Sequence, residues 1–234
     1  MKAILPALLL AACASAPVGE VPVSVAQPEF SVGDQWIYLV RDGYNGEVLR
    51  TYSEKIIAIT EDQVRMRSSG PPLDTGSTET YRPDGNPIDI LTPRAATAVR
   101  YTAYYPAYVF PLEVGNSWQQ DVVIGSANSK NIRAVLHGKM VGWEHVVVPA
   151  GQFDALKIRR EIYLDDEEFW RWGTVASHVD WYVPGIHRFV RQEEHSEYIE
   201  KSGRYPNNIR RGDWTITELL GYAGAATKGA ATKP

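Results

Sequence analysis

Cysteine is almost absent from this chain, since Cys13 is the only one among 234 residues. A single cysteine excludes an internal disulfide, so an exported fold has to be stabilised by its packed core. Long hydrophobic runs are missing too, because the apolar stretch Ala3 to Ala12 is shorter than the ~20 residues that span a bilayer. Basic charge is not in excess, with 24 Lys and Arg against 28 Asp and Glu. That balance argues against a nucleic-acid partner.

Motifs for catalysis and metal binding are also missing. The chain has no G-x-S-x-G element and no glycine-rich phosphate loop, and its five histidines have no HExxH-like spacing. His178 and Asp180 share one strand face, and we interpret them as a surface pair. The acidic run 165–168 is interpreted as a solvated hairpin tip, because it lacks the spaced ligands of a calcium loop. The sequence therefore predicts no catalytic residue, no metal site and no cofactor.

The N-terminal segment resembles a lipoprotein signal. Lys2 supplies a positive charge, an apolar run follows, and Leu10-Ala11-Ala12-Cys13 resembles the lipobox of bacterial lipoproteins. The resemblance implies cleavage before Cys13, so that residues 1–12 are a signal peptide and Cys13 is the lipid attachment site. Acyl chains there would give stable membrane anchoring.

The domain organisation follows from the composition of the two ends. Residues 13–29 contain three prolines and many small residues, which predicts a flexible tether behind the lipidated cysteine. Residues 224–228 and 229–233 repeat the sequence GAATK, and we expect 223–234 to be a disordered tail. A single domain is expected over residues 30–222.

The pattern between these ends predicts an all-β fold. Aromatic and β-branched residues recur with turn signals at short intervals, which favours a large antiparallel curved sheet, open or partly closed like a barrel. Asn45-Gly46 predicts a type I′ hairpin, 68–77 predicts a loop, and short helices are expected near 93–99 or 217–222. Expected strands cover 35–41, 47–60, 64–67, 117–124, 132–141, 145–148, 153–164, 181–183, 188–191 and 213–218.

One local pattern occurs twice. Val32-Gly33 and Val114-Gly115 each stand three residues before a tryptophan, Trp36 and Trp118, that begins a strand. The shared spacing predicts a turn in which the glycine takes a conformation that other residues disfavour. A duplicated half-sheet and the repeated use of one turn both account for the pattern.

Three segments together resemble a family. They are 110–118 (FPLEVGNSW), 147–158 (VVPAGQFDALKI) and 181–191 (WYVPGIHRFVR). This order resembles bacterial envelope proteins of the DUF3108 and TapB-like groups, and the resemblance implies an exported, sheet-rich protein without an established enzymatic role. His187 departs from the pattern, which has glycine after the Pro-Gly turn. The resemblance supplies no catalytic residues.

Aromatic residues are abundant, with 7 Trp, 13 Tyr and 5 Phe. Trp170 and Trp172 are expected on one strand face, with Trp181 nearby in the chain. These three rings are either core packing or contacts to a sugar polymer, peptide or lipid.

The expected function is non-enzymatic binding or scaffolding of an envelope component, whether lipid, glycan or protein. A hydrolase acting on envelope polymer or lipid is the alternative. Ala14 after the cysteine, in place of the Asp that retains Gram-negative lipoproteins at the inner membrane, implies an outer-membrane lipoprotein facing the periplasm in a Gram-negative host.

Overall fold

The computed structural model describes residues 20–94, 96–126, 129–201 and 208–224. Cys13 and most of the expected tail therefore lie outside the described residues. In the described part no helix is long and apolar enough to cross a membrane.

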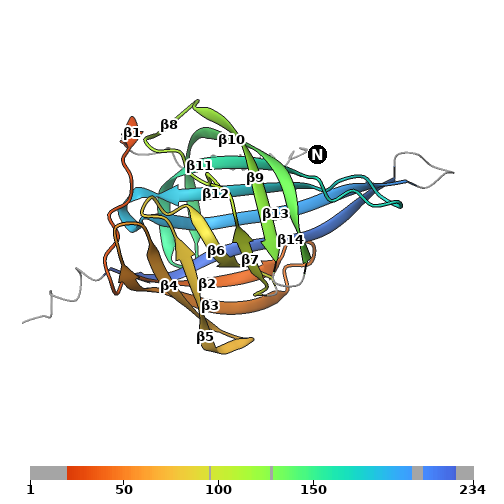
Figure 1. Ribbon diagram of the computed structural model, residues 1–234. Coiled ribbons are helices and arrows are strands. Elements are labelled where there is room, and N and C mark those ends of the chain that lie inside the picture. The colour runs from red at the N-terminus through yellow and green to blue at the C-terminus, as the bar shows by residue number, and fades with distance from the viewer. Residues whose placement is uncertain (1–19, 95, 127–128, 202–207, 225–234) are drawn as a thin grey trace, which may run out of the picture.

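Twelve antiparallel strands form a closed barrel (Figure 1), in the order β10-β11-β12-β13-β14-β2-β3-β4-β5-β6-β7-β9. The all-β prediction is confirmed, and the sheet closes completely. A closed sheet has no edge left for pairing with another chain. The strands are β1 Ser24–Val25, β2 Gln35–Asp42, β3 Val48–Ile59, β4 Val64–Gly70, β5 Leu73–Tyr81, β6 Pro87–Leu91, β7 Ala98–Tyr101, β8 Leu112–Glu113, β9 Ser117–Ser126, β10 Ser129–Val148, β11 Gly151–Leu164, β12 Val175–Val183, β13 Arg188–Glu200 and β14 Asn208–Ala223.

The two remaining strands attach the start of the described chain to the barrel. β1 pairs with β8, with Ser24 opposite Glu113 and Val25 opposite Leu112. Val25 is buried in the same apolar cluster as Leu112. Part of the segment expected as tether is therefore held by backbone pairing and apolar packing.

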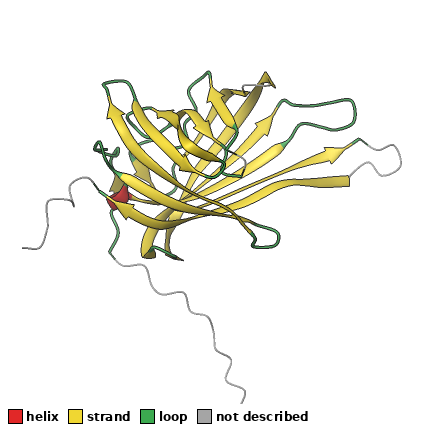
Figure 2. Cartoon of the chain, turned by 90° about the horizontal axis from the view of Figure 1, so that it is seen from below, coloured by secondary structure: helices red, strands yellow, loops and turns green. Residues whose placement is uncertain are grey.

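Two predicted helices and one predicted loop are wrong. Residues 217–222 lie within β14. At the other expected helix, Ala98 and Val99 belong to β7, and the Thr92 amide donates to the Thr97 carbonyl across the β6–β7 connection. The expected loop 68–77 is a tight β4–β5 hairpin, with Ser68 paired to Ser77 and Gly70 to Leu73. Figure 2 shows that the described chain is nearly all strand. The helical element of the described residues is one 3-10 turn, Pro184–Ile186.

The turn chemistry was predicted in part. Gly33 and Gly115 both have positive φ, 102° and 94°, so the repeated pattern uses one glycine turn twice. The β2–β3 hairpin exists, but Gly46 alone has positive φ there, so the turn is not type I′. His187 has φ 59°, the left-handed conformation that glycine would take at this position.

Alternation along each strand fills the barrel. In β2, Trp36, Tyr38 and Val40 are fully buried, while the neighbouring Ile37 is 38% exposed. Trp36 donates to the Ile186 carbonyl at 3.0 Å, and Tyr38 donates to the Phe189 carbonyl at 3.0 Å. These bonds satisfy the polar atoms of buried aromatic rings.

The far end of the β10–β11 hairpin forms a second layer on the outside of the barrel. A bulge between Met140 and Gly142 turns the hairpin, and the Ala150 amide donates to the Leu219 carbonyl at 3.0 Å. Val146 and Val148 share an apolar cluster with Trp181 and Leu219. The expected break between 132–141 and 145–148 is therefore a bulge within one long strand, β10.

Candidate functional site

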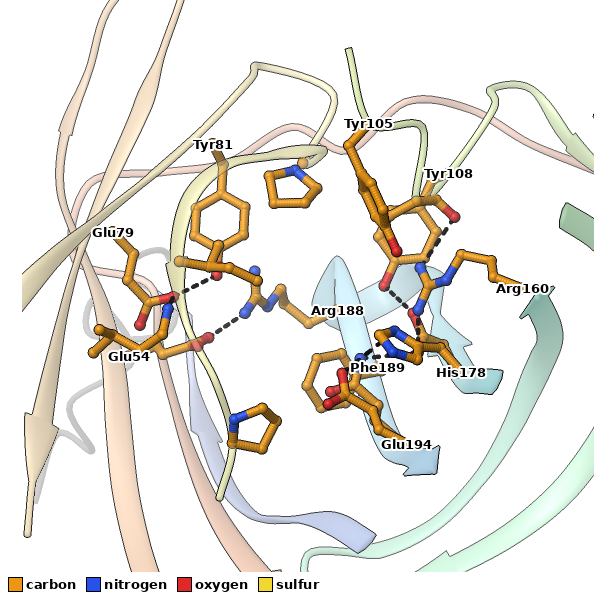
Figure 3. Close-up of a pocket in the computed structure, with 18 of the residues that line it drawn as sticks. Glu54, Glu79, Tyr81, Tyr105, Tyr108, Arg160, His178, Arg188, Phe189 and Glu194 are labelled. Atoms are coloured by element: carbon orange, nitrogen blue, oxygen red, sulfur yellow. Dashed lines mark hydrogen bonds and ion pairs between the residues drawn. The ribbon is translucent and has the colours of Figure 1, made fainter. Parts of the chain in front are cut away.

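A cavity of about 90 Å³ lies inside the barrel, and polar side chains supply much of its lining (Figure 3). Two clusters face each other across it. The first is built from β3, β5 and β13, and the second from β11, β12 and β13. The lining includes Tyr52, Glu54, Glu79, Tyr81, Tyr105, Tyr108, Arg160, His178, Asp180, Arg188, Phe189, Gln192 and Glu194.

The first cluster is centred on Arg188. Its guanidinium forms an ion pair with Glu54, and both side chains are at least 92% buried, with exposures of 8% and 5%. The guanidinium also lies over the ring of Tyr81, 5.0 Å from the centroid. Tyr81 in turn donates its hydroxyl to Glu79 Oε2 at 2.9 Å. Arg188 therefore contacts Glu54 directly and is linked to Glu79 through the ring and hydroxyl group of Tyr81.

The second cluster is centred on Asp180, which is fully buried. Arg160 donates to Asp180 Oδ1 at 2.8 Å, Gln192 donates to the same oxygen at 2.9 Å, and Tyr108 donates to Oδ2 at 2.7 Å. Three donors on one carboxylate compensate the cost of burying its charge. The surface pairing expected for His178 and Asp180 is wrong, because β12 turns this face into the closed barrel.

Strand register sets the order of groups around the second cluster. Arg160, His178, Glu194 and Thr215 are consecutive cross-strand neighbours on β11, β12, β13 and β14. His178 Nδ1 lies 3.5 Å from Glu194 Oε1, and these side chains keep 20% and 24% exposure. A histidine and a carboxyl group therefore stand where the cavity meets solvent.

Burial shifts the pKa values of the cavity's titratable groups, among them two glutamates and a histidine. Burial, reinforced by the Glu54 charge, raises the pKa of Glu79 to about 7. Burial, reinforced by the Asp180 charge, likewise raises the pKa of Glu194 to about 7. Burial and the Arg160 charge lower the pKa of His178 to about 3, so its ring is neutral. Carboxyl groups that titrate near neutral pH in a cavity are typical of functional sites.

A second hollow of about 340 Å³ adjoins the cavity and shares Pro93, His178 and Glu194 with it. We call this hollow the vestibule. Its other lining residues come from the β6–β7 turn and from β12, β13 and β14: Thr92, Arg94, Thr97, Ala176, His195, Ser196, Asp213 and Thr215. The vestibule is therefore next to the charged interior, since Pro93, His178 and Glu194 line both hollows.

The cavity suits a small hydrophilic molecule. Arg160 Nε and Arg188 Nε are buried and bond to no protein atom of the described chain, so they keep donor capacity. The volume accommodates a few water molecules, whereas pockets for drug-sized ligands measure ~300–1,000 Å³. Among the described residues no three His, Cys, Asp or Glu side chains converge as metal ligands.

The aromatic residues singled out from the sequence are not one cluster. Trp181 is only 8% exposed and lies on the outside of the barrel wall, where its indole donates to Glu144 Oε2 at 2.8 Å. Trp170 and Trp172 are 40% and 51% exposed and lie in the connection between β11 and β12. The expectation that they share one strand face is wrong, because hydrogen bonds between the Glu168 and Arg171 backbones place Trp170 in a turn. None of the three lines the cavity.

Sequence reasoning missed most of the cavity residues. Glu54 stands two residues from Tyr52 and from Ile56, in the inward phase of β3, and Arg160 stands in the same way between Ile158 and Ile162 on β11. A charged residue within a run of alternating apolar positions was the available signal. Such a residue points into the barrel with its apolar neighbours.

The fold and the cavity together define a class: a single closed antiparallel barrel with a charged interior. Two crystal structures share this fold. One is a candidate lipoprotein of Parabacteroides distasonis, with a TM-score of 0.53 and 14% identity over 85% of this chain and 99% of that one. The other is a candidate exported protein with a YmcC-like fold from Bacteroides fragilis, with a TM-score of 0.50 and 15% identity over 86% of this chain and 99% of that one.

Comparison by sequence adds no family. No family model matches the chain, and no curated protein matches it significantly. The resemblance to the DUF3108 and TapB-like groups therefore remains an expectation, and the likeness to the two crystal structures concerns the fold.

Proposed function

We propose that this protein is a lipid-anchored envelope protein that binds a small hydrophilic ligand inside its barrel. The observation that carries the proposal is the pair of buried arginine–carboxylate clusters, Arg188–Glu54 and Arg160–Asp180, on opposite sides of one cavity. Buried ion pairs are seldom more stabilising than well-packed apolar residues. Two of them beside a cavity are better explained by binding than by stability.

The charge balance defines the ligand class. Two arginines face two paired carboxylates, and Glu79 and Glu194 are poised between their neutral and charged forms at neutral pH. A neutral molecule rich in hydroxyl groups matches this mixture of donors and acceptors. The cavity takes a molecule the size of a small polyol, and a longer one extends into the vestibule.

A lipid ligand in the interior is disfavoured by the same geometry. An acyl chain would need a larger space and would place methylene groups against ionised side chains, which lose hydration without gaining hydrogen bonds. Of the envelope components expected from the sequence, a glycan or a related small polar molecule fits the cavity better than a lipid.

The proposed location of the protein rests on two features of its sequence. The lipobox-like segment ending at Cys13 supports anchoring in the envelope, and in a Gram-negative host Ala14 supports the outer membrane with the barrel in the periplasm. The start of the described chain is attached beside the barrel by the pairing of β1 with β8, so a short tether would hold the barrel close to the membrane surface.

Mass spectrometry under native conditions tests the proposal on the full chain purified from membranes. We expect a small noncovalent adduct that is absent from Asp180→Asn and retained in Asp165→Asn, the same substitution at the 62% exposed Asp165. Glycerol and N-acetylglucosamine serve as added probes, because a ligand at 100 times its Kd stabilises the fold by about 2.7 kcal/mol. A fatty-acid or phospholipid adduct would overturn the proposal, as would the absence of both an adduct and any probe-induced stabilisation.

A hydrolase acting on envelope polymer is the second candidate. The observation in its favour is the raised pKa of Glu194, close to 7, beside the neutral ring of His178 at the vestibule. A carboxyl group of this kind can act as a general acid. Release of reducing sugar from purified murein, lost in Glu194→Gln, would favour this candidate over ligand binding.

A further inference from the structure

Three arginines in the described part of the chain are buried, and one of them, Arg50, has no carboxylate partner there. Arg160 and Arg188 each form an ion pair. Arg50 is 7% exposed, its Nε bonds no protein atom, and its guanidinium lies over the ring of Tyr52, 4.4 Å from the centroid. Buried arginines are seldom without a charged partner, because water no longer solvates the cation fully.

The carboxylates on the strands around Arg50 are paired with other arginines. Asp42 on β2 accepts a hydrogen bond from Arg94 at 2.9 Å, and Glu54 on β3 pairs with Arg188. Glu54 also stands four residues from Arg50, which is ~13 Å along an extended strand. Arg50 therefore carries a positive charge that the described side chains do not balance.

The register of β3 points Arg50 into the barrel. Its neighbour Thr51 is exposed, whereas Arg50 shares the buried phase of the strand with Tyr52 and Ile56. Tyr52 is part of the lining of the central cavity. A guanidinium that lies over this ring is therefore beside the cavity, on its β3 side.

A second buried polar group without a partner lies two strands away. Arg50 pairs with Val40 across β2 and β3, and Val40 pairs with Thr217 across β2 and β14. Thr217 is 1% exposed, and its hydroxyl bonds no described protein atom. On its other side Thr217 pairs with Gln192, which lines the cavity. Because the sheet closes into a barrel, the inward side chains of β3 and β14 converge over the short side chain of Val40.

An anion suits these two groups. The guanidinium supplies charge-assisted N–H donors and the Thr217 hydroxyl supplies an O–H donor, and an anion accepts from both. One unbalanced cation matches one negative charge. A dianion would bring excess negative charge close to Asp180, whose carboxylate accepts from Gln192 beside Thr217 at 2.9 Å.

We propose that a small monovalent anion, of the size of chloride or formate, binds at Arg50 with the Thr217 hydroxyl as a second donor. The site is distinct from the two arginine–carboxylate clusters that carry the proposed function. A neutral ligand in the cavity leaves the charge of Arg50 unbalanced, so the two sites are compatible.

Thermal unfolding in different sodium salts tests the proposal on the full chain in detergent. The probes are chloride and formate, added in exchange for morpholinoethanesulfonate so that ionic strength stays constant against an anion too bulky for the site. We expect the Tm to rise along a saturation curve with either probe, because a ligand that binds only the folded protein stabilises it. Crystals grown with bromide should show an anomalous scattering peak beside Arg50.

Variants separate binding from a structural role. Arg50→Met should abolish the rise in Tm, while Arg67→Met, the same change at an exposed arginine of β4, should keep it. Arg50→Lys keeps the charge and should retain part of the rise. Thr217→Val keeps the side-chain shape and should weaken the apparent affinity by roughly two- to tenfold, the contribution of one hydrogen bond.

The proposed function and the anion site can fail separately. Asp180→Asn should lose the neutral ligand and keep the response to chloride. Equal Tm values in chloride, formate and the bulky sulfonate would overturn the anion site, as would a rise that Arg50→Met retains. A bromide peak absent from Arg50, or a stronger Arg50-dependent response to sulfate than to chloride, would also overturn it.

Discussion

Removing Arg188 tests whether the charged barrel interior is arranged as described. The substitution Arg188→Met keeps much of the side-chain length but leaves Glu54 buried without its cation. Breaking a buried ion pair by removing one partner costs about 3–5 kcal/mol, because the remaining charge is uncompensated. We expect Arg188→Met to lose that much free energy of unfolding.

The loss should be large in a thermal scan. For a protein of this size 1 kcal/mol shifts the Tm by about 2–4 °C, so the expected drop is roughly 6–20 °C. Urea unfolding monitored by tryptophan fluorescence and by circular dichroism gives the free energy, and an unchanged slope would show that the unfolded state is not altered.

A double mutant separates the pair from the rest of the site. Glu54→Gln combined with Arg188→Met removes both charges, and we expect it to recover most of the stability that Arg188→Met loses. Arg100→Met is the control, since the Arg100–Asp89 pair has exposures of 67% and 32% and should contribute at most about 1 kcal/mol. Strictly additive effects of Glu54→Gln and Arg188→Met would refute the reasoning.

Two further predictions concern pH and anchoring. The pKa of Glu79 is raised from 4.5 to about 7, so its carboxyl group keeps in the folded state a proton that the unfolded chain releases. The free energy of unfolding should therefore fall by roughly 3 kcal/mol as pH rises through that range. The raised pKa of Glu194 should make a smaller contribution of the same sign to the pH dependence of stability, because Glu194 is partly exposed. The pKa of His178 is lowered to about 3, so the folded protein should lose stability as pH falls below 6.5. Urea unfolding at pH 5 and pH 8 measures the difference in stability between the two pH values. Glu79→Gln should reduce this difference, and a difference that stays the same in Glu79→Gln would contradict the assignment. Cys13→Ser should move the protein from the membrane to the soluble fraction, and retention at high salt would contradict the lipobox reading.

The all-β fold was predictable because its signals are local. Apolar and polar residues alternate within each strand, and glycines such as Gly33 and Gly115 mark turns whose positive φ other residues disfavour. The helix wrongly predicted at 217–222 shows the limit of such local signals. Its Thr217 and Leu219 point into packed surroundings that only the pairing of β14 with β2 and β13 creates.

The candidate site was not predictable in the same way. Asp180 belongs to a segment that also suits a wet strand face, and it is fully buried only because the sheet closes on itself. Arg188 and Glu54 are 134 residues apart in the chain, so no local pattern reports that they meet. Trp181 was grouped with Trp170 and Trp172 by proximity in sequence, yet the length of β12 separates their surroundings.

The sequence by itself determined the strand content, several turns and the expectation of a lipid anchor at Cys13, because each depends on neighbouring residues. Tertiary structure decided which charged side chains face the barrel interior and which aromatic rings stay exposed in the β11–β12 connection. Closure of the sheet is the physical reason, since it fixes one face of every strand as interior and brings distant strands into register.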